Sequence, residues 1–163
     1  MEKFLLLALA VSLAHALSEL EGDWVSTAID ADNVAKIANQ GTLRLYFHKM
    51  TCLEGYDKLE ITFYVNLSGQ CSKTTVVVYK QEDGNYRTQY EGDTIFKPMI
   101  ITKEILVFTN ENVDRDSLET HLIFVAGKGD HLTHEQYGRL EEHAKEQKIP
   151  SESIRKLLVS SNL

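Results

Sequence analysis

Apolar and polar side chains alternate along most of the chain beyond residue 22, in short segments separated by turn signals. In the segment 58–66, for example, apolar residues stand at every second position from Leu59 to Val65. A period of two is typical of a half-buried β-strand. The pattern predicts eight strands with no helix between them: Trp24–Ala31, Thr42–Cys52, Lys58–Asn66, Cys71–Gln81, Asn85–Glu91, Thr94–Ile101, Ile105–Asn110 and Leu118–Ala126.

The connections between these strands favour hairpins. Ser68–Gly69, Asp83–Gly84 and Gly92–Asp93 are turn sequences, and the longer segment 32–41 is expected to be a loop in which Asp32 can cap a helical turn. Consecutive antiparallel strands in an open sheet leave two unpaired edges, which closure removes. The expected fold is therefore all-β, an eight-stranded antiparallel up-and-down β-barrel over about residues 22–127.

The pattern changes to a helical period after the strands. Thr133 and Gln136 form a capping-box sequence, and apolar residues follow at helical spacing, which predicts an amphipathic helix at 133–146 packed on the outside of the barrel. Ser151 can cap a second short helix, expected at about 151–159, whose apolar stripe includes Ile154 and Leu157.

The first residues have the pattern of a secretory signal peptide at 1–16. Lys3 precedes a short apolar run, and Ala14 and Ala16 form an A-x-A cleavage pattern. The run is too short to span a bilayer, so the expected mature protein, 17–163, is a single exported domain without membrane insertion. A formal net charge of −7 without a Lys/Arg cluster argues against nucleic acid as a partner.

A cavity inside the barrel is the expected functional site. If the alternating apolar face points inward, the polar residues among the lining are few, and Tyr90 and Asn110 are the candidates for a hydrogen bond to a ligand. Such a lining suits a small neutral hydrophobic ligand. Alternatively, these side chains fill a solid core, and Tyr90 bonds to backbone at the rim. The predicted lining is Leu45, Phe47, Ile61, Phe63, Val65, Val76, Val78, Tyr90, Thr94, Phe96, Phe108, Asn110, Leu122 and Phe124.

The sequence gives little support for a charged ligand, a catalytic site or a metal site. No ionised side chain falls clearly on the inner face, which disfavours anionic ligands and amines. No Ser/His/Asp signature stands out, and His131 and His134 have metal-like spacing without further ligands nearby. We therefore expect no metal, no cofactor and no enzymatic activity.

Three short motifs resemble those of the lipocalin family. Gly22–Trp24 resembles its first motif, and Asn112–Asp114 lies at the turn where the family has its second. Lys128 stands where most members carry an arginine packed over the tryptophan. The resemblance implies a ligand-binding barrel in which Gly22, Trp24, Asp114 and Lys128 are structural residues. It also implies a cation–π contact of Lys128 with the ring of Trp24.

The odorant- and pheromone-binding lipocalins secreted by mammalian glands are the subgroup that the chain resembles most. Tyr86, Tyr90 and Gly92 match their Y-x-x-x-Y-x-G pattern. There are two departures. Tyr56 replaces a cysteine often found four residues after Cys52, and the tail lacks the usual partner cysteine of Cys71.

The two cysteines are expected at opposite rims of the barrel, which excludes a disulfide between Cys52 and Cys71. Asn66 begins an N-x-S sequon in a predicted turn and is a candidate glycosylation site.

The sequence thus predicts an extracellular carrier of a small hydrophobic, odorant- or pheromone-like molecule. The alternatives are a lipocalin that acts through its loops on a macromolecular partner, as an inhibitor or receptor ligand, and a cavity-thiol isomerase. The isomerase is disfavoured because neither cysteine lies mid-strand on the apolar face. The ligand itself, a receptor and a homodimer are left open.

Overall fold

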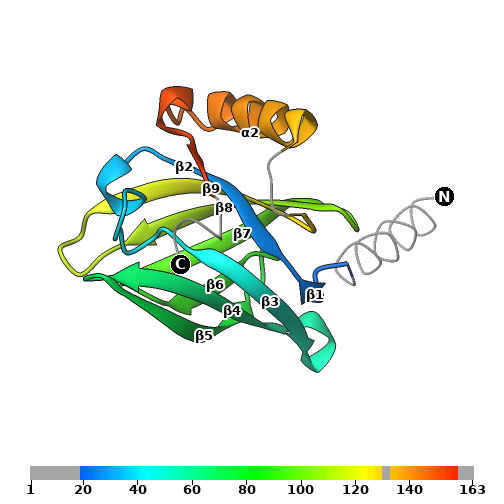
Figure 1. Cartoon of the computed structure of the whole chain (residues 1–163). Helices are drawn as coiled ribbons and strands as arrows, with labels where there is room; N and C mark the ends of the chain where they lie inside the picture. Colours follow the sequence, from blue (N-terminus) through cyan, green and yellow to red (C-terminus); the bar gives the residue numbers. More distant parts are fainter. Residues whose placement is uncertain (1–18, 130–132, 158–163) are drawn as a thin grey trace.

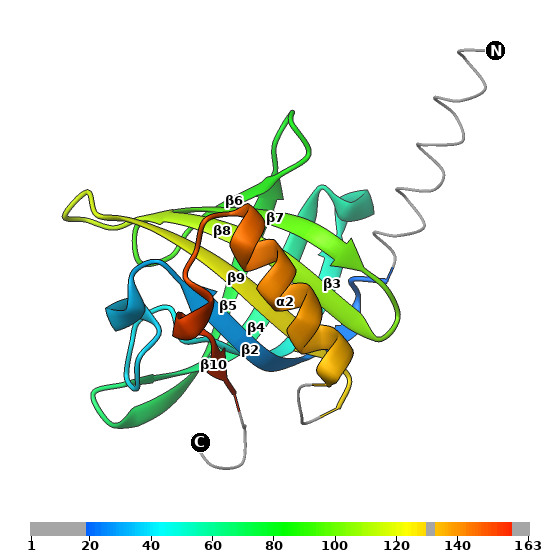
Figure 2. The ribbon, with the colours of Figure 1, turned by 90° about the horizontal axis from the view of Figure 1, so that it is seen from above.

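One antiparallel sheet coils around an apolar interior, and one helix lies against its outer surface (Figures 1 and 2). The computed structural model describes residues 19–129 and 133–157. The strands are β1 (Gly22–Asp23), β2 (Val25–Ala31), β3 (Tyr46–Leu53), β4 (Lys58–Leu67), β5 (Gln70–Lys80), β6 (Tyr86–Gln89), β7 (Asp93–Ile101), β8 (Ile105–Val113), β9 (Glu119–Gly127) and β10 (Arg155–Lys156). The helix is α2 (His134–Glu146), and short 3₁₀ turns lie at Val34–Lys36, Glu54–Tyr56 and Ser151–Ser153.

The sheet closes at Trp24. Its strand order is β1-β3-β4-β5-β6-β7-β8-β9-β2-β10, so β1 and β2, which flank this residue, pair with strands at opposite ends of the meander. Trp24 N donates to His48 O at 3.1 Å, and Phe47 N donates to the Ser26 hydroxyl at 2.8 Å. The predicted barrel is confirmed, with its first strand divided in two where the chain crosses from one end of the sheet to the other.

The indole of Trp24 is fully buried beside the N-terminal segment. Its Nε1 donates to Leu20 O at 2.8 Å, and Lys128 Nζ lies 3.7 Å from the ring centroid while donating to Asp23 O. Gly22 has a φ of +130°, which favours glycine and lets the chain bend just ahead of the ring. Trp24 therefore connects the N-terminal segment, through Leu20, with Lys128, the residue that directly follows β9.

Two apolar layers lie on the two faces of the sheet. The inner layer fills the barrel, and the outer layer, with Ala28, Val107, Ile123 and Val125, lies beneath Leu140 and Ala144 of α2. Figure 2 shows α2 crossing over β8 and β9. The capping box of Thr133 and Gln136 is present, as the sequence predicted. The helix is thus an external support and contributes no side chain to the interior.

The prediction of a second short helix at about 151–159 is wrong for its described part. After the 3₁₀ turn, Arg155 and Lys156 form β10, which pairs with Ile29 and Ala28 of β2. Leu157 N then donates to Thr27 O at 2.9 Å. The physical reason is that β2 offers unpaired backbone groups on the edge away from β9, and an extended segment satisfies them better than a helix.

Two further predictions of local structure, a strand from Thr42 and a cap at Asp32, are wrong. The segment 42–45 is a turn followed by irregular chain, not the start of a strand, although Leu43 and Leu45 still border the cavity. Asp32 does not cap the turn Val34–Lys36, because its carboxylate binds His121 instead. The signal peptide expected at 1–16 lies outside the described residues. Among the residues described, no helix is long and apolar enough to cross a membrane.

The two cysteines are far apart and free. Cys52 is opposite Leu59, which is opposite Val78 on β5, and Cys71 lies at the other end of β5. Seven residues of strand separate Val78 from Cys71, or about 23 Å. The prediction that they do not pair is confirmed.

One buried carboxyl is poorly satisfied. Asp30 of β2 is fully buried on the outer face, and its Oδ1 accepts from Ala31 N at 3.0 Å, while Oδ2 has no partner among the described residues. Burial raises the pKa of Asp30 to about 6, although the charge of Arg155 acts in the opposite direction. Because the folded state favours the protonated carboxyl, the contribution of Asp30 to stability is greatest in acid, below its unfolded pKa. It falls as the pH rises toward about 6.

We predict that Asp30→Asn stabilises the protein at pH 7 by up to about 3 kcal/mol, because it removes a buried carboxylate with one unpaired oxygen. The gain should shrink to near zero by about pH 4. Urea unfolding across this pH range measures it, with Asp57→Asn at an exposed position as the control. A variant less stable than the natural protein at pH 7 would contradict the prediction.

Candidate ligand-binding cavity

A narrow cavity lies at the centre of the barrel. The space open to the centre of a water-sized sphere is about 40 Å³. Side chains from β3 to β9 and from the loop before β3 surround it: Leu43, Leu45, Phe47, Ile61, Phe63, Val76, Val78, Thr88, Tyr90, Thr94, Phe96, Phe108, Asn110, Asn112, Leu122 and Phe124.

The structure brings together every residue of the predicted lining except Val65, which is buried in the same core without bordering the cavity. Three lining residues were missed from the sequence: Leu43, Thr88 and Asn112. Leu43 has the same alternation as Leu45, and Asn112 stands two positions after Asn110, so a period of two extended further would have found them.

Aromatic rings fill much of the interior. The ring centroid of Phe108 lies 4.3 Å from that of Phe96, 5.1 Å from that of Phe124 and 5.2 Å from that of Phe47. Tyr90 stands edge-on to Phe63 at 5.2 Å. A ligand with more than a few heavy atoms must therefore displace side chains, and rings are the groups that it would contact.

The polar groups of the cavity gather at the end nearest the loop 32–45. Tyr90 donates its hydroxyl hydrogen to Thr42 O in this loop at 3.2 Å. Burial raises the pKa of Tyr90 to about 12, so the phenol stays neutral. Of the two roles considered for Tyr90, the structure therefore shows the backbone bond at the rim.

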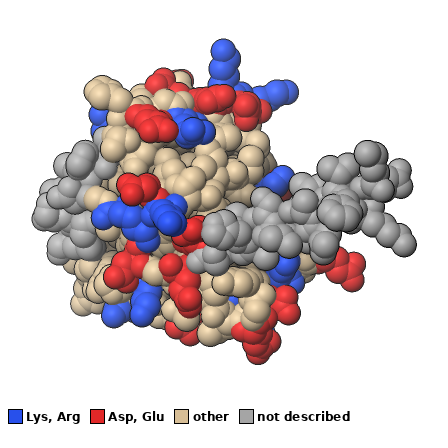
Figure 3. Space-filling view, turned by 90° about the vertical axis from the view of Figure 1, so that its right-hand side faces the viewer, with Lys and Arg blue, Asp and Glu red and all other residues tan. Residues whose placement is uncertain are grey.

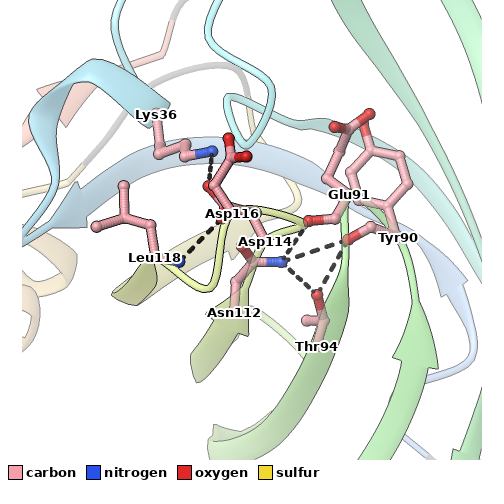
Figure 4. A network of polar contacts seen from close by, with 8 residues as sticks. All are labelled: Lys36, Tyr90, Glu91, Thr94, Asn112, Asp114, Asp116 and Leu118. Atoms are coloured by element: carbon pink, nitrogen blue, oxygen red, sulfur yellow. Dashed lines mark hydrogen bonds and ion pairs between the residues drawn. The ribbon is translucent and has the colours of Figure 1, made fainter.

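Asn112 organises the turn between β6 and β7 (Figure 4). Its Nδ2 donates to Tyr90 O at 3.3 Å, to Glu91 O at 3.2 Å and to Thr94 Oγ1 at 2.8 Å. Gly92, with a φ of +103°, allows this close approach because a Cβ there would lie 2.1 Å from Val113 O. The motif residues Gly92 and Asn112 thus hold the same turn from two sides.

Two ion pairs tie the loop 32–45 to β9 and to the turn before it. Lys36 Nζ lies 2.8 Å from Asp114 Oδ2, and Asp114 Oδ1 accepts from the backbone N–H of Leu118 (Figure 4). The hydrogen bond from Lys36 holds the pKa of Asp114 below its usual value. Asp32 Oδ2 lies 2.9 Å from His121 Nδ1 and raises the pKa of His121. The loop is therefore anchored over this end of the barrel.

Of the side chains that the structure describes, none that lines the cavity is charged. On the outer face drawn in Figure 3, acidic and basic side chains are interspersed among uncharged areas. Within 19–129 and 133–157, no cluster of three or more His, Cys, Asp or Glu side chains is arranged to hold a metal ion. Burial raises the pKa of Cys52 to about 11, so this thiol is protonated at neutral pH, and neither cysteine borders the cavity.

We predict that Phe108→Ala lowers the free energy of unfolding by about 3–5 kcal/mol, because it removes a ring that is almost fully buried among three others. Urea unfolding gives the value. Tyr79→Ala, at a half-exposed position on the outer face, is the control and should change stability by less than about 0.5 kcal/mol. A loss below about 1 kcal/mol for Phe108→Ala would show that the ring is not tightly packed.

Comparison with known proteins agrees with this geometry. The model of the lipocalin / cytosolic fatty-acid binding protein family matches residues 21–160. An odorant-binding protein of Phodopus sungorus is 54% identical over 143 residues, covering 88% of this chain and 95% of the relative.

Two solved structures share the fold. The crystal structure of aphrodisin, described as a sex pheromone from female hamster, superposes with a TM-score of 0.85 at 46% identity, covering 88% of this chain and 98% of that one. A complex of bovine odorant-binding protein with undecanal gives a TM-score of 0.66 at 28% identity, covering 82% of this chain and 85% of that one. With its motifs, its closed barrel and a family match over nearly all of the described residues, the chain belongs to the lipocalin family.

Proposed function

We propose that this lipocalin is an extracellular carrier that binds a small, neutral, hydrophobic molecule of the odorant or pheromone type inside its barrel. The observation that carries the proposal is the partly enclosed cavity lined mainly by apolar side chains, with a few polar groups at one end. Burial of apolar surface supplies affinity in such a site, and the lack of lining charge excludes recognition of an ion.

The relatives support the same role. Odorant-binding proteins and aphrodisin share about half of their sequence with this chain, and the bovine structure was solved with an apolar aldehyde. The protonated Cys52 thiol, which does not border the cavity, argues against covalent catalysis there. The protein is thus proposed to carry its ligand without transforming it.

A matched pair of valines on β5 tests the proposal. Val76 borders the cavity, whereas Val77, the next residue, points to the outer face. Val76→Phe should fill the narrow interior and weaken micromolar binding of the fluorophore N-phenyl-1-naphthylamine by at least about tenfold, whereas Val77→Phe should leave it unchanged. Fluorescence titration of the purified protein gives both affinities.

Two results would contradict the carrier. If correctly folded natural protein binds no apolar probe, action through the loops on a macromolecular partner becomes the better explanation. If both variants lose binding equally, the probe does not occupy the barrel. Circular dichroism of both variants shows whether the fold is intact.

The proposal includes export. We propose that residues 1–16 are a leader that is removed, that 17–163 fold as one domain, and that Asn66 carries a glycan in the exported protein. Asn66 lies near the tip of the β4–β5 hairpin, with its side chain on the outer face. N-terminal sequencing of protein secreted by mammalian cells should begin at Leu17. A mass shift on treatment with peptide N-glycosidase, absent in Asn66→Gln, would identify the glycan, and an uncleaved N-terminus would contradict the leader.

A further inference from the structure

The polar groups that border the cavity differ in what they can still offer to a ligand. They are Thr88, Tyr90, Thr94, Asn110 and Asn112. Each hydroxyl has one hydrogen to donate and lone pairs to accept with, and each amide has one donor end and one acceptor end. The hydrogen bonds that these groups already make decide which capacity remains.

All three hydroxyl hydrogens are directed to backbone carbonyls. Thr88 donates to Val77 O at 2.9 Å, Tyr90 to Thr42 O at 3.2 Å, and Thr94 to Tyr90 O at 3.2 Å. A carbonyl oxygen can only accept, so the direction of each bond is certain. None of the three hydroxyls can donate to a ligand without breaking a bond to the backbone.

The amide of Asn112 is oriented just as firmly. Its Nδ2 faces Tyr90 O and Glu91 O, which are acceptors only, so an exchange of the nitrogen and oxygen positions would place oxygen against oxygen. Figure 4 shows the nitrogen pointing at this turn. Asn112 Oδ1, on the other side of the amide, is buried and has no hydrogen-bond partner within the described part of the chain.

The neighbours of Asn112 do not satisfy this oxygen. Thr120 stands opposite Asn112 in the β8–β9 ladder, but its own buried hydroxyl forms no hydrogen bond among the described residues. Asn110 Oδ1 is likewise buried without a partner. No such bonds hold the amide of Asn110, so it can present its NH₂ group by rotating. Among the described polar residues that border the cavity, the unpaired amide oxygens are therefore those of Asn110 and Asn112, and the unpaired donor is the NH₂ group of Asn110. The unpaired hydroxyl of Thr120 does not border the cavity.

We infer that the cavity selects ligands that carry a hydroxyl donor, namely alcohols and phenols, over ketones, aldehydes and ethers of the same carbon skeleton, and that Asn112 Oδ1 is the acceptor that makes the distinction. The inference rests on the proposed carrier function. A ligand hydroxyl can satisfy the buried Asn112 Oδ1, whereas a carbonyl or ether oxygen leaves it unpaired even when it accepts from Asn110. A site built to bond a ligand hydroxyl discriminates strongly against an analogue that lacks it.

Matched ligand pairs test the inference on the natural mature protein. Displacement of N-phenyl-1-naphthylamine gives the affinities of octan-2-ol and octan-2-one, and of 4-ethylphenol and 4-ethylanisole. We expect the donor of each pair to bind about tenfold more tightly. Equal affinities, or tighter binding of the ketone and ether, would overturn the inference while leaving the carrier intact. If neither the fluorophore nor any of the four ligands binds, the carrier function fails, and the inference fails with it.

A variant assigns the acceptor. Asn110→Leu removes the amide that can present a free donor and leaves the bonds of Asn112 in place, so the preference for the alcohol should persist or increase. A fall of the ratio to about one would assign recognition to Asn110 and overturn the role of Asn112. Asn85→Leu, in the β5–β6 turn outside the cavity, is the control and should leave all four affinities unchanged.

Discussion

The passage of the chain through Trp24 is the constraint on which the barrel depends. Because β1 and β2 belong to one continuous segment, their pairing with β3 and with β9 joins the two ends of the meander. The indole fixes this crossing through Leu20 O and the ammonium of Lys128. Closure at this crossing then surrounds the inner side chains with strands, apart from the outer part of the β2 edge, which β10 covers. Such a surround is the condition for an internal site.

At the end of the barrel nearest the loop 32–45, buried polar groups must find their hydrogen-bond partners within the protein. The loop and turns there bring backbone carbonyls close to the cavity, and buried carbonyls need donors. The side chains of Tyr90, Thr94 and Asn112 supply them. The same bonds that stabilise the turn at Gly92 thus use up most of the donors of the cavity and leave that of Asn110 free. The structural and recognition roles of these side chains are therefore coupled. A hydrogen atom that they donate to a backbone carbonyl is not available for a hydrogen bond to a ligand.

Much of the fold and of the candidate site was accessible from the sequence. A period of two separates inner from outer residues whatever the exact register, so the residues from Leu45 to Phe124 predicted to point inward do so, and all but Val65 border one cavity. The capping box at Thr133 likewise marked the start of α2, because this signal is entirely local. The helix predicted at 151–159 does not form in its described part beyond the 3₁₀ turn, because Arg155 and Lys156 pair with the free edge of β2, a partner more than a hundred residues away.

By itself, the sequence determined which side chains face the interior, how the strands follow one another and that no charge lines the cavity, since all of these follow from local alternation and residue type. Only the tertiary structure decided how narrow the cavity is and which polar atoms remain free in it. Those properties depend on ring positions and on bonds such as that of Tyr90 to Thr42, between residues far apart in the chain. The sequence alone does not show which donors and acceptors of the cavity stay unpaired. Their partners come from distant strands and loops and are in place only in the folded barrel.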